Sequence, residues 1–119
     1  MQIEQNKHDQ HLEVRLTGRL DAQQAGVVDL HLGDAVRRGE HRIRLHMAAV
    51  PYMSSAGIRI LLKYFRTLRG LGGGFVVIEP SEMVRSILEM AGLADMLFSG
   101  KTERPVEEGG AASTHERSF

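Results

Sequence analysis

Two adjacent serines, Ser54 and Ser55, hold the positions in this chain that best suit chemistry. They stand in PYMSSAGIRILLKYF, residues 51–65, between a short apolar run and a strongly amphipathic basic segment. A hydroxyl at the start of a helix can cap backbone N–H groups, which contributes on the order of 1 kcal/mol. It can also receive a phosphate, which those N–H groups and the positive end of the helix dipole favour. The sequence leaves both uses open.

A serine in this position could also be the nucleophile of a hydrolase. Hydrolases of the α/β type place that serine in a Gly-x-Ser-x-Gly elbow, whereas MSSAG has glycine on one side only. A triad of Ser55, His46 and Asp21 is conceivable, but no stretch of the chain indicates an oxyanion hole. The pattern therefore disfavours a serine hydrolase.

Two further clusters suggest chemistry and have simpler explanations. His8 and His11 in HDQH could hold a metal ion, but the chain has no HExxH helix and no second ligand pair at a recognisable spacing. We expect turn residues there, and neither a metal nor a cofactor. The glycines of GLGGGF, residues 70–75, lack the Lys-Ser/Thr ending and the following helix of a phosphate loop. They predict a linker from helix to strand.

The segment after the serines predicts an amphipathic helix that ends near Gly70. Its apolar stripe repeats at intervals of three and four residues and consists of Ile58, Leu61, Leu62, Phe65 and Leu68. Its other side is basic and consists of Arg59, Lys63, Arg66 and Arg69. This side is either a solvated face or a docking surface for an acidic partner.

The elements that must position these residues alternate along the chain. Apolar residues at every second position predict strands at 12–17 and 41–47, and QIEQ before the first of them predicts a weaker partner in a hairpin. Helical spacing predicts a helix over about 22–38 and another that starts after Ser81 and stops at Gly92. The apolar run FVVI predicts a buried strand. The order indicates an α/β fold with a mixed, mainly parallel central sheet, helices packed on it and an N-terminal hairpin.

Length and composition limit what the chain can be. At 119 residues with 42% hydrophobic residues it predicts one domain over 1–99, followed by a disordered tail over 100–119. Its 15 acidic and 15 basic residues balance, which argues against direct nucleic-acid binding. The chain has no cysteine, a polar N-terminus and no long apolar window, so we expect a cytoplasmic protein that does not enter a membrane.

Three motifs, in order and at ordinary spacing, make the chain resemble the STAS domain, the fold shared by bacterial anti-sigma factor antagonists and the cytosolic domains of sulfate transporters. LTGRLDAQQA, residues 16–25, is similar to the family's Gly-x-Leu-Asp element. VPYMSSAGIRILL, residues 50–62, is similar to its Asp-Ser-Ser/Thr-Gly signature and recognition helix. GGGFVVIEPSEMVRSILEMAGL, residues 72–93, is similar to its next strand and helix. The resemblance covers about residues 1–98 and implies a STAS fold.

Carried over by position, the family's phosphoacceptor serine falls on Ser55. The resemblance implies an anti-sigma factor antagonist without catalysis of its own, which binds a GHKL-fold serine kinase that doubles as an anti-sigma factor. It implies that phosphorylation ends this binding and that a PP2C-type phosphatase resets the protein. The partner-binding residues implied are Asp21, Ser54, Ala56, Gly57, Arg59, Lys63 and Arg66.

The chain departs from the family pattern in four places. Ala56 stands where the family has Ser or Thr, which removes a second hydroxyl from the site. The usual Asp before the phosphoacceptor is Ser54, and the usual Asp or Asn near the end of the preceding strand is His46. The family's last helix has no counterpart in EEGGAASTHE, residues 107–116, so we expect a fold shortened at its C-terminal edge. The alternative to a phosphorylation switch is a non-catalytic STAS scaffold or sensor module in a larger signalling complex.

Overall fold

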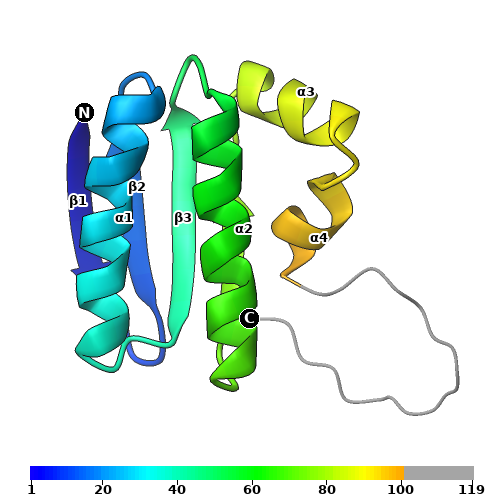
Figure 1. Ribbon diagram of the computed structural model, residues 1–119. Coiled ribbons are helices and arrows are strands. Elements are labelled where there is room, and N and C mark those ends of the chain that lie inside the picture. The colour runs from blue at the N-terminus through cyan, green and yellow to red at the C-terminus, as the bar shows by residue number, and fades with distance from the viewer. Residues whose placement is uncertain (101–119) are drawn as a thin grey trace, which may run out of the picture.

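The computed structural model describes residues 1–100. They form one β-sheet with α-helices packed against it (Figure 1). The strands are β1 (Gln2–Lys7), β2 (Leu12–Thr17), β3 (Arg42–Ala49) and β4 (Gly74–Ile78). The helices are α1 (Ala22–Arg37), α2 (Ser55–Gly70), α3 (Glu82–Met90) and α4 (Ala94–Ser99).

The sheet is mixed and mainly parallel, which confirms the predicted fold class. Its strand order is β1-β2-β3-β4. β1 and β2 form the predicted antiparallel hairpin, whereas β2–β3 and β3–β4 pair in parallel. Parallel neighbours require crossover connections, and α1 and α2 supply them.

The core lies on one face of the sheet. In β2, Leu12, Val14 and Leu16 are buried, and the residues between them point to the opposite face, where Arg15 and Thr17 are exposed. The helices α1 and α2 lie side by side over the apolar face (Figure 1). The helices α3 and α4 lie beyond α2 and complete the core with Val84, Leu88 and Leu97.

The glycine cluster is the predicted linker between α2 and β4. Gly72 has a φ of +80°, a conformation that residues with a Cβ rarely adopt. A Cβ on Gly73 would lie 1.7 Å from the carbonyl oxygen of His41, so the chain can pass here only without a side chain.

The structure also corrects the predicted elements. β3 continues to Ala49, two residues beyond the predicted end at Met47, and Pro51 stands after it. Helix α4 was not predicted, because six residues are too few to display a helical repeat.

The predicted tail beyond Gly100 and the stretch EEGGAASTHE lie outside the described residues, so those expectations stay predictions. Within residues 1–100, none of the helices combines the length and the apolar character needed to cross a bilayer.

Candidate functional site

The loops that follow β2 and β3 lie against each other at one edge of the sheet. The amide of Leu20 donates to the carbonyl of Tyr52 at 2.9 Å, and the amide of Ser54 donates to the carbonyl of Leu20 at 2.9 Å. The next residues along the two loops, Asp21 and Ser55, stand at the starts of α1 and α2. Both helices consequently begin at the same end of the sheet (Figure 1).

Ser55 is exposed at the first position of α2. The first amide of this segment that bonds within the helix is that of Ile58, which donates to the carbonyl of Ser54 at 3.2 Å. The amides of the preceding turn belong to the N–H groups that a helix leaves without an intrahelical acceptor. An anion on Ser55 would lie where these groups and the helix dipole favour negative charge.

The expectation that one of the serines caps α2 is not met by Ser54. Ser54 occupies the N-cap position with an extended backbone, but its side chain makes no capping hydrogen bond. Its Oγ is buried and has no hydrogen-bond partner. The start of α2 therefore lacks the side-chain acceptor that usually occupies this position.

Gly57 and Ala56 pack the first turn of α2 against the core and the preceding loop. Gly57 is buried, and a Cβ there would come within 2.7 Å of Met53 Cγ and 3.0 Å of Leu20 Cγ. Ala56 is partly buried and packs against the core. Gly57 thus allows α2 to lie close to the loop that contains Leu20 and Met53. It affects a binding surface only indirectly, because it positions Ser55.

The basic side of α2 divides into tethered and unpaired cations. Arg59, Lys63 and Arg66 are all exposed. Lys63 Nζ lies 2.9 Å from Asp29 Oδ1 on α1, whereas no ion pair is found for Arg59 or Arg66 among residues 1–100. The acid that pairs with this side comes from the neighbouring helix, which the sequence of α2 alone does not reveal.

Asp29 also joins the two helices through Tyr64. The Tyr64 hydroxyl donates to Asp29 Oδ1 at 2.6 Å. This hydrogen bond, together with that from Lys63, holds the pKa of Asp29 below its usual value. Burial and the bond to Asp29 raise the pKa of Tyr64.

The residues of the conceivable hydrolase triad do not assemble. His46 is 7% exposed, and its Nε2 lies 3.0 Å from Glu13 Oε1 while its Nδ1 lies 3.4 Å from Glu79 Oε1. Asp21 Oδ1 instead accepts from the amide of Gln24 at 2.9 Å and caps α1. Among residues 1–100, neither His46 nor Asp21 forms a hydrogen bond with Ser55.

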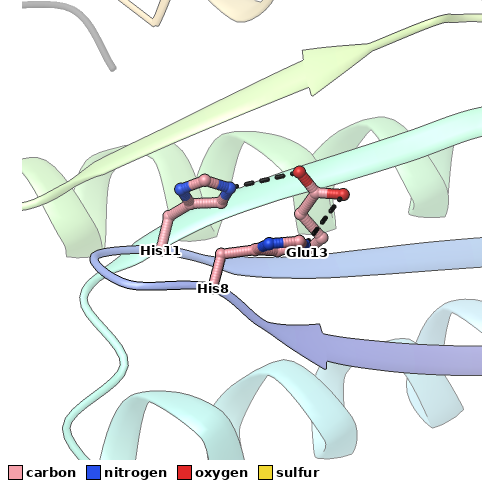
Figure 2. Close-up of side chains that lie close together, drawn as sticks. All are labelled: His8, His11 and Glu13. Atoms are coloured by element: carbon pink, nitrogen blue, oxygen red, sulfur yellow. Dashed lines mark hydrogen bonds and ion pairs between the residues drawn. The ribbon is translucent and has the colours of Figure 1, made fainter.

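Glu13 connects a polar cluster that sequence reasoning missed. His8, His11 and His46 all contact its carboxylate, and Figure 2 shows the first two with it. The hydrogen bond from His11, with a further contribution from His46, holds the pKa of Glu13 below its usual value. The sequence signal was the spacing of His11 and Glu13, because side chains two residues apart in an extended chain lie on one face; His11 directly precedes β2 and Glu13 lies within it.

Comparison with known proteins agrees with this geometry. A model of the STAS domain family matches residues 2–109. The chain belongs to the STAS domain family. The match includes both loops of the candidate site and the whole of α2, so it confirms the resemblance drawn from the three motifs.

Relatives of this STAS domain protein are named anti-sigma factor antagonists. BtrV of Bordetella bronchiseptica, classed with anti-sigma factor antagonists, is 32% identical over 92 residues, which span 77% of this chain and 79% of BtrV. The anti-sigma F factor antagonist of Paenibacillus polymyxa is 30% identical over 94 residues, which span 78% of this chain and 80% of that protein.

Solved structures of SpoIIAA, an anti-sigma factor antagonist, share the fold. Its unphosphorylated form superposes with a TM-score of 0.72 at 21% identity and covers 86% of this chain and 90% of SpoIIAA. The phosphorylated form of the Bacillus protein superposes with a TM-score of 0.67 at 21% identity and covers 86% of this chain and 93% of that structure. The predicted STAS fold is confirmed.

Proposed function

We propose that this STAS domain protein is an anti-sigma factor antagonist switched by reversible phosphorylation of Ser55. The observation that carries the proposal is an exposed hydroxyl on the first turn of α2, at a helix start without a side-chain cap. The names of the relatives support the antagonist role. SpoIIAA, which shares the fold, has been solved with and without phosphate.

The partner in this proposal is a GHKL-type serine kinase that is also the anti-sigma factor, and a PP2C-type phosphatase removes the phosphate. The kinase must reach the hydroxyl of Ser55, and the exposure of that residue permits this. We assign the kinase-binding surface to the neighbourhood of Ser55, with contacts from Asp21, Ser54, Ala56, Arg59, Lys63 and Arg66, while the buried Gly57 positions the helix start. Within this surface, Arg59 and Arg66 supply charge that no ion pair in residues 1–100 neutralises.

Phosphorylation would change this surface without a need to unfold the domain. A phosphate adds a charge of about −1.5 to −2 and three strong acceptor oxygens at neutral pH. On Ser55 it would stand one helical turn from Arg59, since residues four apart on a helix are neighbours. A kinase surface with acidic groups that fits the unphosphorylated protein would then meet negative charge, and binding would weaken.

Mass spectrometry after incubation with a GHKL-type serine kinase and ATP tests the acceptor. We expect a single phosphate on Ser55 in the wild-type chain, the same phosphate in Ser54→Ala, and none in Ser55→Ala. The two variants are matched because they remove neighbouring hydroxyls of different exposure. Phosphate on Ser54, or none on the wild-type chain, contradicts the proposal.

Calorimetric binding to the same kinase tests the switch. We expect Ser55→Asp to weaken the affinity at least about tenfold, because its carboxylate supplies part of the charge of a phosphate. Ser55→Ala should bind like wild type. Equal affinities for Ser55→Asp and Ser55→Ala would remove charge exclusion as the mechanism. A defined oligomer formed without any kinase, together with no kinase binding, would favour the scaffold alternative.

A further inference from the structure

The β1–β2 turn brings two histidines together on the polar face of the sheet. The amide of His8 donates to the carbonyl of His11 at 2.9 Å, so these residues face each other across the two-residue turn of Asp9 and Gln10. Their rings stack with centroids 5.1 Å apart and planes inclined by 19°. Both rings extend toward Glu13 (Figure 2).

The donor atoms of the three side chains converge. His11 Nε2 lies 3.1 Å from Glu13 Oε2, and His8 Nε2 lies 3.7 Å from Glu13 Oε1. One ligand atom from each residue lies within 4.8 Å of the others. Zinc bonds of about 2.0–2.1 Å in tetrahedral geometry place two donor atoms about 3.3 Å apart. Small side-chain rotations would therefore bring these donors to bonding distance around one ion.

We propose that His8, His11 and Glu13 form a binding site for a divalent transition metal ion, with zinc as the best match. Two imidazoles and one carboxylate are a donor set that zinc uses in proteins, and three protein ligands leave a fourth position for water. Imidazole also disfavours magnesium and calcium, which select oxygen ligands. His8 and His11, which were expected only to form a turn, would thus be metal ligands because the hairpin places both beside Glu13.

A second layer of contacts holds the carboxylate in place. His46, whose side chain is 9% exposed, has its Nε2 3.0 Å from Glu13 Oε1 and its Nδ1 3.4 Å from Glu79 Oε1. Such outer partners orient metal ligands and strengthen binding. Arg44 Nη1 stands 4.0 Å from Glu13 Oε2, beyond hydrogen-bond distance, and its positive charge opposes a cation at the site. We therefore expect a dissociation constant in the micromolar range.

The proposed metal site is separate from the phosphorylation site. Glu13 lies near the start of β2, and the loop that contacts Ser54 follows the end of that strand. Glu13 also points away from the face that α1 and α2 cover, since Leu12 and Val14 on either side of it are buried in the core. Zinc binding should thus not depend on Ser55.

Isothermal titration of zinc chloride into the untagged full-length protein at pH 7.5 tests the site. We expect one zinc per chain, with an affinity that falls at least tenfold in His8→Gln and in His11→Gln. His31→Gln is the matched control, because His31 is an exposed histidine on α1, and it should bind like wild type. Ser55→Ala should also bind like wild type.

Imidazole NMR signals provide a second measurement that does not rely on variants. Zinc should shift the signals of His8 and His11 and leave that of His31 unchanged. The proposal is overturned if zinc fails to bind at micromolar concentrations, or if His8→Gln and His11→Gln retain the wild-type affinity. An equal loss in His31→Gln would place the ion elsewhere and would overturn it as well.

Discussion

The starts of α1 and α3 differ from the start of α2 in how their first N–H groups are satisfied. Asp21 caps α1 by accepting from the amide of Gln24 at 2.9 Å, and Ser81 caps α3 by accepting from the amide of Val84 at 3.2 Å. Ser54 occupies the same position before α2 and caps nothing. Of these three helix starts, those of α1 and α3 are capped by a side chain, whereas that of α2 is not; the short helix α4 also starts without a side-chain cap.

The comparison of Ser54 with Ser81 shows that residue type does not decide this difference. Both serines have extended backbones, with φ −89° and ψ 174° for Ser54 and φ −65° and ψ 166° for Ser81. The Ser81 hydroxyl donates to the carbonyl of Val50 at 2.6 Å while it caps, whereas the Ser54 hydroxyl is buried without a partner. N–H groups without a side-chain acceptor would favour a phosphate on Ser55, and the buried Ser54 hydroxyl without a partner has a cost in stability.

The largest change in stability should follow from a side chain added at Gly57, in the first turn of α2. We expect Gly57→Ala to lower the free energy of unfolding by about 1–3 kcal/mol, because its Cβ would overlap Met53 and Leu20. Urea denaturation measures this change. Gly26→Ala, within α1, is the control: nothing lies within 4 Å of its Cβ, so alanine should raise stability by about 0.5–1 kcal/mol. Equal effects of the two substitutions would refute the tight packing of the signature glycine.

Removal of the two working caps should have the next largest effect. Asp21→Ala and Ser81→Ala should each lower the free energy of unfolding by about 1 kcal/mol, within a range of 0.5–2. Thermal and urea denaturation measure the change. Asp21→Ser keeps an acceptor at the N-cap and should recover most of the loss. An Asp21→Ala variant as stable as wild type would show that the cap contributes nothing.

The middle of α2 is bonded to α1 through Asp29, which contacts Lys63 and Tyr64. Loss of the Asp29 carboxylate should lower the free energy of unfolding by a smaller amount that depends on pH. The pKa of Asp29 is lowered in the folded protein, so its bonds stabilise the fold above the unfolded pKa, about 3.9, and this contribution is lost as pH falls through the folded pKa. Asp29→Asn should therefore cost about 0.5–1 kcal/mol at pH 7.

Urea denaturation of Asp29→Asn and wild type at pH 7 and near pH 2.5 checks the sign. The difference between the two proteins should shrink at the lower pH. Asp34→Asn is the matched control, since Asp34 is exposed and pairs with Arg37 inside α1. A difference that is the same at both pH values would contradict the role of the Asp29 carboxylate.

Much of the fold could be predicted from sequence because its signals are local. Apolar residues alternate in β2 and β3 and repeat at helical spacing in α1, α2 and α3, so type and order of these elements follow from one window at a time. The start of α2 at the serines was foreseeable for the same reason. Helix α4 is too short for such a repeat and was missed.

The polar cluster and the state of Ser54 could not be predicted, because both depend on contacts between distant segments. Glu13 and His46 are 33 residues apart and meet only through the register of β2 and β3. The Ser54 hydroxyl loses its capping role in a loop that is held against Leu20 by a backbone hydrogen bond. Local propensity favours serine as a cap, and tertiary packing overrides it here.

The smallest change in stability is expected for a substitution of Ser54. It tests most directly whether the start of α2 differs from the capped start of α3. Because its hydroxyl makes no hydrogen bond, Ser54→Ala should change the free energy of unfolding by less than about 0.5 kcal/mol, or should increase it by relieving a buried unsatisfied group. Ser81→Ala in the same urea experiment is the matched serine that caps. A loss of about 1 kcal/mol in both variants would mean that Ser54 caps α2 in solution and that Ser55 does not face an open helix start.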